Sequence, residues 1–145
     1  MSIGQNKEVV ILWLEARDKG NWDLIDELFA PDYVCHLASD PEPVRGRDKV
    51  KQMQVGHRFA FDIYPTDEPD LFVAEGDLVV HRQSVRMKPK DPLRGFPPTD
   101  KEAIVAHIDI YRVVDGRIVE QWIHLDRFGL MQQLDNFPPP AYSES

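Results

Sequence analysis

The sequence predicts an α+β fold in which helices come first and a mostly antiparallel sheet follows. Within the first 61 residues, apolar residues recur at three- and four-residue spacing, which is typical of amphipathic helices. From residue 71 onward they alternate with polar residues between short turns, which is typical of β-hairpins. Because helices and strands do not alternate along the chain, a parallel βαβ architecture is not expected.

Three helices are predicted in the N-terminal half. The first extends from about Asn6 to Lys19, before Gly20, a residue that commonly follows a helix. Asn21 can cap a short second helix that ends before Pro31, and a third covers Arg47 to Phe61. Each has one apolar side, made of Val9, Leu12, Trp13 and Ala16, then Trp22, Ile25, Leu28 and Phe29, then Val50, Met53, His57 and Phe61.

The strands are predicted from short alternating runs bounded by turn residues. Tyr33 to Leu37 is a short entry strand, and two hairpins follow, separated by the proline-rich loop Pro89 to Pro98. A short last helix follows from about Arg127 to Leu134. The first hairpin joins Leu71–Ala74 to Leu78–Met87 through Glu75-Gly76-Asp77, and the second joins Ala103–Val113 to Ile118–Leu125 around Asp115-Gly116.

Length and composition favour one globular domain over residues 1–145, with an ordered core of about 6–134 and a loose tail. The 17 basic and 25 acidic residues give a net charge of −8, which disfavours nucleic acid as a partner. No apolar run is long enough for a membrane span, and no signal peptide is recognised. The single cysteine, Cys35, allows no intrachain disulfide, so a cytoplasmic location is expected.

Six short motifs occur in an order that is more informative than any one of them. Together they resemble the SnoaL-like polyketide cyclase family, within the nuclear-transport-factor-2-like superfamily, over about Asn6 to Leu134. The motifs are Gly20-Asn21-Trp22-Asp23, Asp32-Tyr33-Val34, Glu75-Gly76-Asp77, Gly95-Phe96-Pro97-Pro98-Thr99, Tyr111-Arg112-Val113-Val114-Asp115-Gly116-Arg117-Ile118 and Gly129-Leu130-Met131-Gln132-Gln133-Leu134. The resemblance implies a cone-shaped domain whose helices cover the concave face of a curved sheet. It also implies a cavity for a hydrophobic small molecule and a homodimer formed through the outer sheet face.

Strand alternation sorts side chains between the two faces of the sheet. His107, Asp109 and Tyr111 share one face, and a three-residue turn with Gly116 in the left-handed conformation would pair Val113 with Arg117. His107 would then lie opposite Ile123, and Asp109 opposite Gln121. A two-residue Asp-Gly turn would instead bring Trp122 and His124 beside His107. The first register is preferred because it groups Arg112, Glu120 and Trp122 on the outer face.

With this register, the predicted cavity wall contains several polar side chains. The residues expected to contact a substrate are His36, His81, Gln83, Gln121 and Ile123, and the catalytic candidates are Asp109 and His107. A carboxylate and an imidazole two residues apart on one strand can transfer a proton between them and a substrate. The alternative is structural, with Asp109 holding a neighbouring group and His107 packed in the core. The sequence does not decide between these two interpretations.

The resemblance carries one departure. In the family, a catalytic acidic residue follows the large residue of the last strand, and the matching position here is Ile123, after Trp122. The position of the family's assisting histidine corresponds to Asp109. Either the acid has moved to Asp109, or the cyclase chemistry is absent.

Other chemistries lack support in the sequence. No cysteine cluster or spaced histidine pair predicts a metal site, and no glycine-rich motif predicts a nucleotide cofactor. Asp126 is interpreted as the cap of the last helix. We therefore expect a cofactor-independent cyclase or isomerase that acts on a hydrophobic carbonyl compound. The alternatives are an epoxide or ester hydrolase and a binding protein without catalysis.

Overall fold

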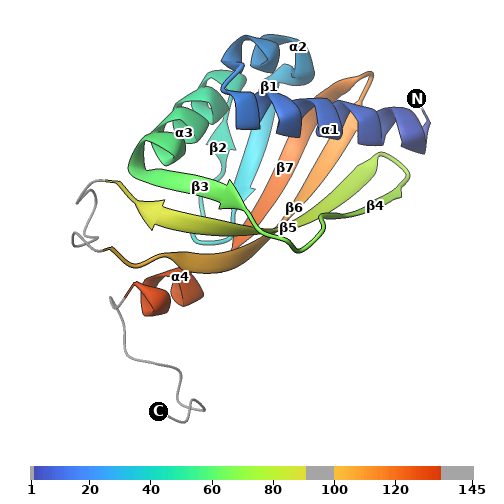
Figure 1. Cartoon of the computed structure of the whole chain (residues 1–145). Coiled ribbons are helices and arrows are strands. Elements are labelled where there is room, and N and C mark those ends of the chain that lie inside the picture. Colours follow the sequence, from blue (N-terminus) through green and yellow to red (C-terminus); the bar gives the residue numbers. More distant parts are fainter. Residues whose placement is uncertain (1, 91–99, 135–145) are drawn as a thin grey trace.

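The computed structural model describes residues 2–90 and 100–134, with only the backbone for 57–59 (Figure 1). The predicted loop after Lys90 and the tail from residue 135 lie outside the described residues, as does the side chain of His57. In order, the elements are α1 (Ile3–Lys19), a 3-10 turn (Trp22–Leu24), α2 (Ile25–Leu28), β1 (Phe29–Leu37), β2 (Val44–Arg45), α3 (Arg47–Ala60), β3 (Phe61–Pro65), β4 (Leu71–Glu75), β5 (Leu78–Pro89), β6 (Ala103–Val114), β7 (Arg117–Leu125) and α4 (Arg127–Gln133).

The described strands form one mixed, mostly antiparallel sheet, which confirms the predicted α+β class. The strand order is β2-β1-β7-β6-β5-β3, and β4 also pairs with β5. Only β1 and β7 among the described pairs run parallel, because the connection between them spans most of the chain. Helices α1 and α3 lie over the same side of the curved sheet, and α4 lies toward its opposite end (Figure 1).

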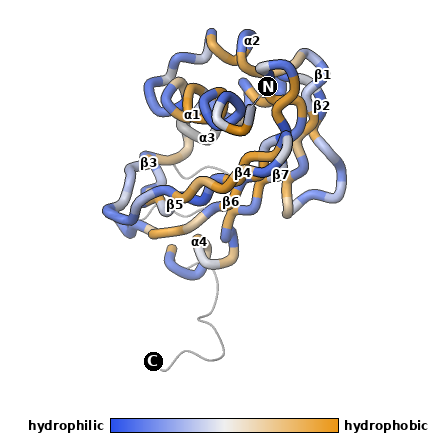
Figure 2. Tube along the Cα trace, turned by 90° about the vertical axis from the view of Figure 1, so that its right-hand side faces the viewer, coloured by the Kyte–Doolittle hydropathy of each residue, from blue (hydrophilic) through white to orange (hydrophobic). Residues whose placement is uncertain are grey.

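Helix α1 packs against the centre of the sheet through one apolar side. Ser2 caps its first turn by accepting a hydrogen bond from the Gln5 amide, and Gly20 ends it with a φ of 71°. Trp13 lies edge-on to Phe29, with ring centroids 4.9 Å apart, and Phe29 meets Tyr33 in the same way. Figure 2 shows hydrophobic and hydrophilic residues alternating around α1, as expected for a helix that buries one side only.

A second apolar cluster fills the other end of the sheet. Met87, Ala103 and Val105 of β5 and β6 pack against Leu130 and Leu134 at α4. Ala103 and Val105 lie on the same face of β6 as His107 and Asp109, because even numbers of positions separate them, and Met87 points to that face because it pairs with Ala103. The two clusters leave a space between them, in which the candidate site lies.

Several local features differ from the predictions. Phe29 and Phe61, which were assigned to helices, are the first residues of β1 and β3, and strands β2 and β3 were not predicted. Phe61 pairs with Pro89 of β5, so its strand conformation depends on a residue 28 positions away. Pro31 does not end a helix but lies where the β1–β7 pairing is irregular. Proline has no amide hydrogen, and at this position no regular hydrogen bond between strands requires one.

The hairpin between β6 and β7 combines features of both predicted registers. Val114 pairs with Arg117, so the turn has two residues, Asp115 with φ 52° and Gly116 with φ 78°. The pairing then shifts by one residue, from Val113 opposite Ile118 to Arg112 opposite Glu120. This bulge reverses the parity of β7 beyond it.

The consequence is that the preferred turn was wrong but the assignment of faces was right. Asp109 lies opposite Ile123 rather than Gln121, and His107 lies opposite Leu125 rather than Ile123. Trp122 and His124 pair with Ile110 and Ile108 on the outer face. No helix of the described residues is long and apolar enough to cross a membrane.

Candidate functional site

A cavity of about 510 Å³ lies between the concave face of the sheet and the helices α1, α3 and α4. Its described lining is mainly apolar, a composition typical of sites for hydrophobic small molecules. The apolar part includes Leu37, Met53, Phe61, Ile63, Val85, Met87, Ile123, Leu125 and Leu130, and the polar part includes Arg17, Gln83, His107 and Asp109.

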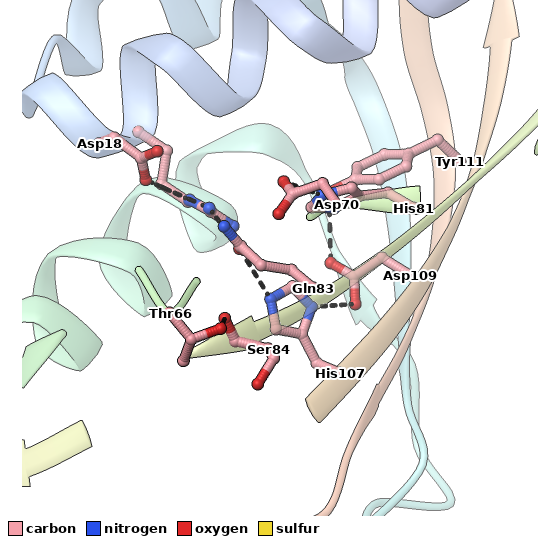
Figure 3. Close-up of polar contacts among 10 residues, drawn as sticks. Asp18, Thr66, Asp70, His81, Gln83, Ser84, His107, Asp109 and Tyr111 are labelled. Carbon is pink, nitrogen blue, oxygen red and sulfur yellow. Dashed lines mark hydrogen bonds and ion pairs between the residues drawn. The ribbon is translucent and has the colours of Figure 1, made fainter. Parts of the chain in front are cut away.

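The strand registers bring the polar groups together. Gln83 of β5 lies opposite His107 of β6, and Asp109 of β6 lies opposite Ile123 of β7. All four side chains line the cavity. Figure 3 shows Gln83, His107 and Asp109 as neighbours, with Asp18 at the far end of the group, near α1.

Asp109 is a buried carboxylate whose two oxygens have different surroundings. Its Oδ2 accepts hydrogen bonds from the Tyr111 hydroxyl and from Nε2 of Gln121, both at 3.2 Å. Its Oδ1 is buried and accepts no well-formed hydrogen bond from the described residues, and it lies 3.4 Å from Nδ1 of His107. Oδ1 is thus the oxygen of this carboxylate that the described protein groups leave without a regular hydrogen bond.

His107 is oriented from its other nitrogen. Its Nε2 lies 3.1 Å from Oε1 of Gln83, and the same oxygen accepts a hydrogen bond from Nη2 of Arg17 at 3.1 Å. A guanidinium can only donate, so the Gln83 atom must be the carbonyl oxygen, and Nε2 of His107 must carry a hydrogen.

This orientation determines what the contact between His107 and Asp109 requires. With its hydrogen on Nε2, a neutral imidazole would point the Nδ1 lone pair at the carboxylate oxygen. The contact is attractive only if one proton lies on Nδ1 or on Oδ1. Such a pair could hold a single transferable proton, either as imidazolium and carboxylate or as imidazole and carboxylic acid.

Two predicted wall residues lie behind the cavity surface. Gln121 is buried among Asp109 and Tyr33, and its Oε1 accepts a hydrogen bond from the Tyr33 hydroxyl at 2.8 Å. Burial raises the pKa values of Tyr33 and Tyr111 well above their usual range, so both remain hydrogen-bond donors. The expected substrate contact of Gln121 is thus replaced by support of Asp109.

His81 is also covered, and it contacts protein groups on all sides. Its Nε2 donates to Oδ2 of Asp70 at 2.8 Å, and its ring stacks on Phe72 with centroids 4.7 Å apart. Burial lowers the pKa of His81, and the hydrogen bond that His81 donates to Asp70 opposes that effect only in part. His81 is absent from the described lining of the cavity. The substrate contact predicted for it from the sequence is therefore not supported.

The prediction that His36 reaches the cavity was wrong. Leu37 of β1 lines the cavity, so the side chain of His36 points to the opposite face. There it stacks on Trp122 and lies 2.8 Å from Oε2 of Glu120. Arg112 joins the same cluster through Glu120 and through a bidentate pair with Asp77.

Asp126 has the structural position predicted for it. Its Oδ1 accepts a hydrogen bond from the Gly129 amide at 2.9 Å, which caps α4. Cys35 is buried, and burial raises the pKa of its thiol, which argues against a role as nucleophile. The described residues contain no group of three histidine, cysteine or acidic side chains placed to bind a metal ion.

Sequence reasoning missed Arg17, the cationic group closest to the acid–base pair. A signal for Arg17 was present in the sequence. Arg17 comes three residues after Leu14 and four after Trp13, on the side of α1 that also carries Val10. An arginine on the buried stripe of a helix indicates a polar contact inside the fold. Its partner Gln83 is 66 positions away and could not be identified from spacing.

Comparison with known proteins gives a consistent result. The model of the family described as SnoaL-like polyketide cyclase matches residues 7–134. No curated protein matches the chain in sequence. Among solved structures, IdmH of Streptomyces antibioticus, described as a candidate polyketide cyclase, has 29% identity and a TM-score of 0.76, and the match covers 90% of this chain and 99% of IdmH.

Two further structures share the fold at lower identity. A candidate polyketide cyclase from Xanthomonas campestris pv. campestris is 18% identical, with a TM-score of 0.81 over 91% of this chain and 98% of its own. An epoxide hydrolase of the LEH-like type from M. tuberculosis is 15% identical, with a TM-score of 0.68 over 91% of this chain and 90% of its own. At these identities the likeness concerns the fold and not the reaction.

Proposed function

This chain belongs to the SnoaL-like polyketide cyclase family, and from that premise we propose that it is a cofactor-independent enzyme acting on a hydrophobic carbonyl compound. The reaction is removal of a proton from the carbon next to a carbonyl group, followed by cyclisation or isomerisation. The observation that supports it best is Asp109, a buried carboxylate in an apolar cavity whose Oδ1 has only the His107 ring nitrogen beside it.

Asp109 is the general base in this proposal. When His107 holds the shared proton, Asp109 is a carboxylate, and Oδ1 takes the proton from the substrate carbon. The C–H electron pair forms the enolate C=C bond, and the carbonyl electron pair moves onto oxygen. Asp109 then returns the proton, to a second carbon in an isomerisation or to the new alkoxide oxygen in an aldol cyclisation.

His107 and the groups behind Asp109 keep the base in position. The imidazolium balances the charge of the carboxylate, while Tyr111 and Gln121 hold Oδ2 and so fix the orientation of the Asp109 carboxylate. Gln83 holds the His107 ring by its Nε2 hydrogen and is itself part of the cavity wall. Such fixed partners reduce the reorganisation needed when charge moves to the substrate.

The position of Ile123 fits the same proposal. The family's acid position is opposite Asp109 in the β6–β7 pairing, on the same face of the sheet. Directly opposite residues in an antiparallel pair have Cβ atoms about 5 Å apart. A carboxylate on β6 therefore reaches the same part of the cavity as one on β7, and the acid is proposed to have changed strand.

The test is exchange of α-protons in deuterium oxide, followed by proton NMR. The bicyclic ketone 2-tetralone serves as a probe, because it is apolar, enolisable and small enough for the cavity. We expect the protein to accelerate exchange over buffer and over Asp109→Asn. Absence of acceleration with this ketone and with 1-indanone would contradict the proposal. Conversion of an aryl epoxide to a diol that incorporates oxygen from labelled water would instead indicate a hydrolase.

A further inference from the structure

Arg17 places a positive charge inside a cavity that is otherwise mainly apolar. It lies in the last turn of α1, and its side chain is only 10% exposed. Its Nε and Nη2 atoms lie 3.1 Å from Oδ1 of Asp18, which is 55% exposed and hydrated, and Nη2 also donates to Gln83. Burial of a guanidinium costs free energy, so its retention in a cavity wall suggests a function.

Hydrogen-bond donors remain available at this point of the wall. Oε1 of Gln83 is occupied by Arg17 and His107, so the amide group of Gln83 is left as a pure donor toward the cavity. Within the part of the chain that the structure describes, neither this amide nor Nη1 of Arg17 has an acceptor. The two groups together present several N–H bonds and no acceptor.

The charged residues of the lining also favour an anionic ligand. Although the chain has a net charge of −8, the described lining contains two arginines, Arg17 and Arg127, and one carboxylate, Asp109. The carboxylate of Asp109 lies against the His107 ring. A cavity with low-dielectric walls and a guanidinium whose described carboxylate partner, Asp18, is largely exposed to solvent favours an anionic group in its ligand.

We propose that Arg17 and the amide group of Gln83 form the binding site for an anionic oxygen of the ligand. The substrate class is a carbonyl compound with an aromatic or alicyclic body, and the oxygen bound is the carbonyl oxygen that becomes the enolate. A ligand that carries a permanent carboxylate at this place binds through the same donors. The role in enolate formation rests on the function proposed above, whereas the binding of an anionic oxygen does not.

Gln83 and His107 connect the proposed anion site to Asp109. Arg17 and His107 bind the same oxygen of Gln83, each at 3.1 Å, and His107 in turn contacts Asp109 at 3.4 Å. In this proposal, a carbonyl oxygen at the donors has its neighbouring carbon on the Asp109 side of the cavity. Donors aimed at the developing charge stabilise the enolate more than the ketone, which lowers the barrier of the proton transfer.

The first experiment measures binding and needs no turnover. Dissociation constants of 2-naphthoate and 2-naphthamide, which differ in charge but hardly in shape, are measured by calorimetry. We expect the wild type to prefer the carboxylate by at least about tenfold, Arg17→Gln to lose the preference, and Arg17→Lys to keep part of it. Lys19→Gln, which removes an exposed positive charge from the same helix turn, should keep it entirely.

Equal affinity of the wild type for the two probes, or an unchanged preference in Arg17→Gln, would overturn the proposal. So would failure of both probes to bind. The wild-type comparison gives a result even if the variants fold poorly, and circular dichroism of Arg17→Lys identifies a loss caused by unfolding.

The second experiment separates the two proposals. In the 2-tetralone exchange assay, Arg17→Gln should lower the rate constant at saturating ketone by about a hundredfold, the usual effect of removing one donor to an oxyanion. Asp109→Asn should abolish exchange but retain the preference for 2-naphthoate. If the wild type catalyses no exchange while the Arg17-dependent preference is present, the proposed function fails and the anion site stands. If exchange depends on Asp109 but neither property depends on Arg17, only the anion site fails.

Discussion

The two faces of the sheet each carry a histidine next to a carboxylate, but in very different surroundings. On the inner face, His107 and Asp109 are largely buried in an apolar cavity, and one carboxylate oxygen lacks a regular hydrogen bond. On the outer face, His36 and Glu120 are partly exposed, and Glu120 also pairs with Arg112. There the hydrogen bonds from His36 and Arg112 lower the pKa of Glu120, although burial alone would raise it.

The difference shows that the surroundings on each face of the sheet, and not the residue type, determine how the carboxylate behaves. The outer carboxylate has cationic partners that stabilise its charged form, so it has little tendency to take up a proton near neutral pH. The inner one is largely buried, and the His107 ring lies beside its Oδ1. The same residue types therefore form a surface ion-pair network on one face and, in the proposed function, an acid–base pair on the other.

The largest effect that this comparison predicts comes from removing each carboxylate in turn. Asp109→Asn keeps the shape and removes the proton acceptor, so 2-tetralone exchange should fall by at least about a hundredfold. Binding of the ketone should stay within a few-fold. Glu120→Gln, the matched change on the outer face, should leave the exchange rate almost unchanged. Equal losses in the two variants would remove the functional distinction between the faces.

The next prediction moves the inner acid to the neighbouring strand. Because Ile123 lies opposite Asp109, the double variant Asp109→Asn with Ile123→Asp restores an acid at the family position. It should recover at least about tenfold of the exchange activity lost in Asp109→Asn. A charge in the apolar wall should lower the free energy of unfolding by about 2 kcal/mol, measured by denaturant titration. A double variant that folds but shows no recovery would contradict the equivalence of the two positions.

A third prediction concerns what covers the outer face. Ile104 is 52% exposed and Ile108 is 42% exposed, next to the cluster of Arg112 and Trp122, so we expect this face to be buried in a homodimer. Ile108→Asp should weaken the dimer by at least about tenfold. Sedimentation equilibrium should give about twice the chain mass of 16.8 kDa for the wild type. A wild-type monomer at micromolar concentration would refute this prediction.

A fourth and smaller effect tests whether Asp126 belongs with the catalytic or the structural acids. Asp126→Ala removes the cap of α4 and should lower the free energy of unfolding by about 1 kcal/mol, while the exchange activity persists. Asp126→Asn retains a cap and should be close to the wild type. Loss of activity in Asp126→Ala at an unchanged melting temperature would assign Asp126 to the site instead.

The smallest expected effect is the pH dependence of stability. The folded-state pKa of His81 lies below its ordinary value of 6.5, because burial disfavours the charged ring. The contribution of His81 to the free energy of unfolding is complete above pH 6.5. It is lost as the pH falls from 6.5 through the lower folded-state pKa, because the unfolded chain binds the proton first. His81→Gln should flatten this part of the profile in denaturant titrations.

Glu120 provides the contrast from the outer face. The folded-state pKa of Glu120 lies below 4.5, so its contribution to the free energy of unfolding is lost only as the pH falls below 4.5. Solvent screening keeps this contribution small. Glu120→Gln should change the profile below pH 4.5 and not above. A profile between pH 4.5 and 6.5 that depends on Glu120 and not on His81 would reverse the assignment of the two windows.

The sequence by itself determined the α+β class, most element positions and the faces of the strands. Strand parity is a local property, since successive side chains point to opposite sides whatever the partner strand is. That is why His107 and Asp109 were placed on one face before any pairing was known, whereas the face of Ile123 depended on the register assumed for the last hairpin. The family motifs added the cavity and the position at which an acid was missing.

The tertiary structure decided which of these residues face the cavity and which lie behind its wall. His81 and Gln121 have the right parity, but Asp70 and Phe72, from the adjoining hairpin, bind and cover His81, and Tyr33, 88 positions away, binds Gln121. The bulge beyond Val113 restored the predicted faces after a turn of a different length, and no local pattern announced it. Arg17 reaches Gln83 only because α1 crosses the sheet at that point. Parity acts within one strand, whereas burial and pairing depend on neighbours brought together from 66 or more positions away.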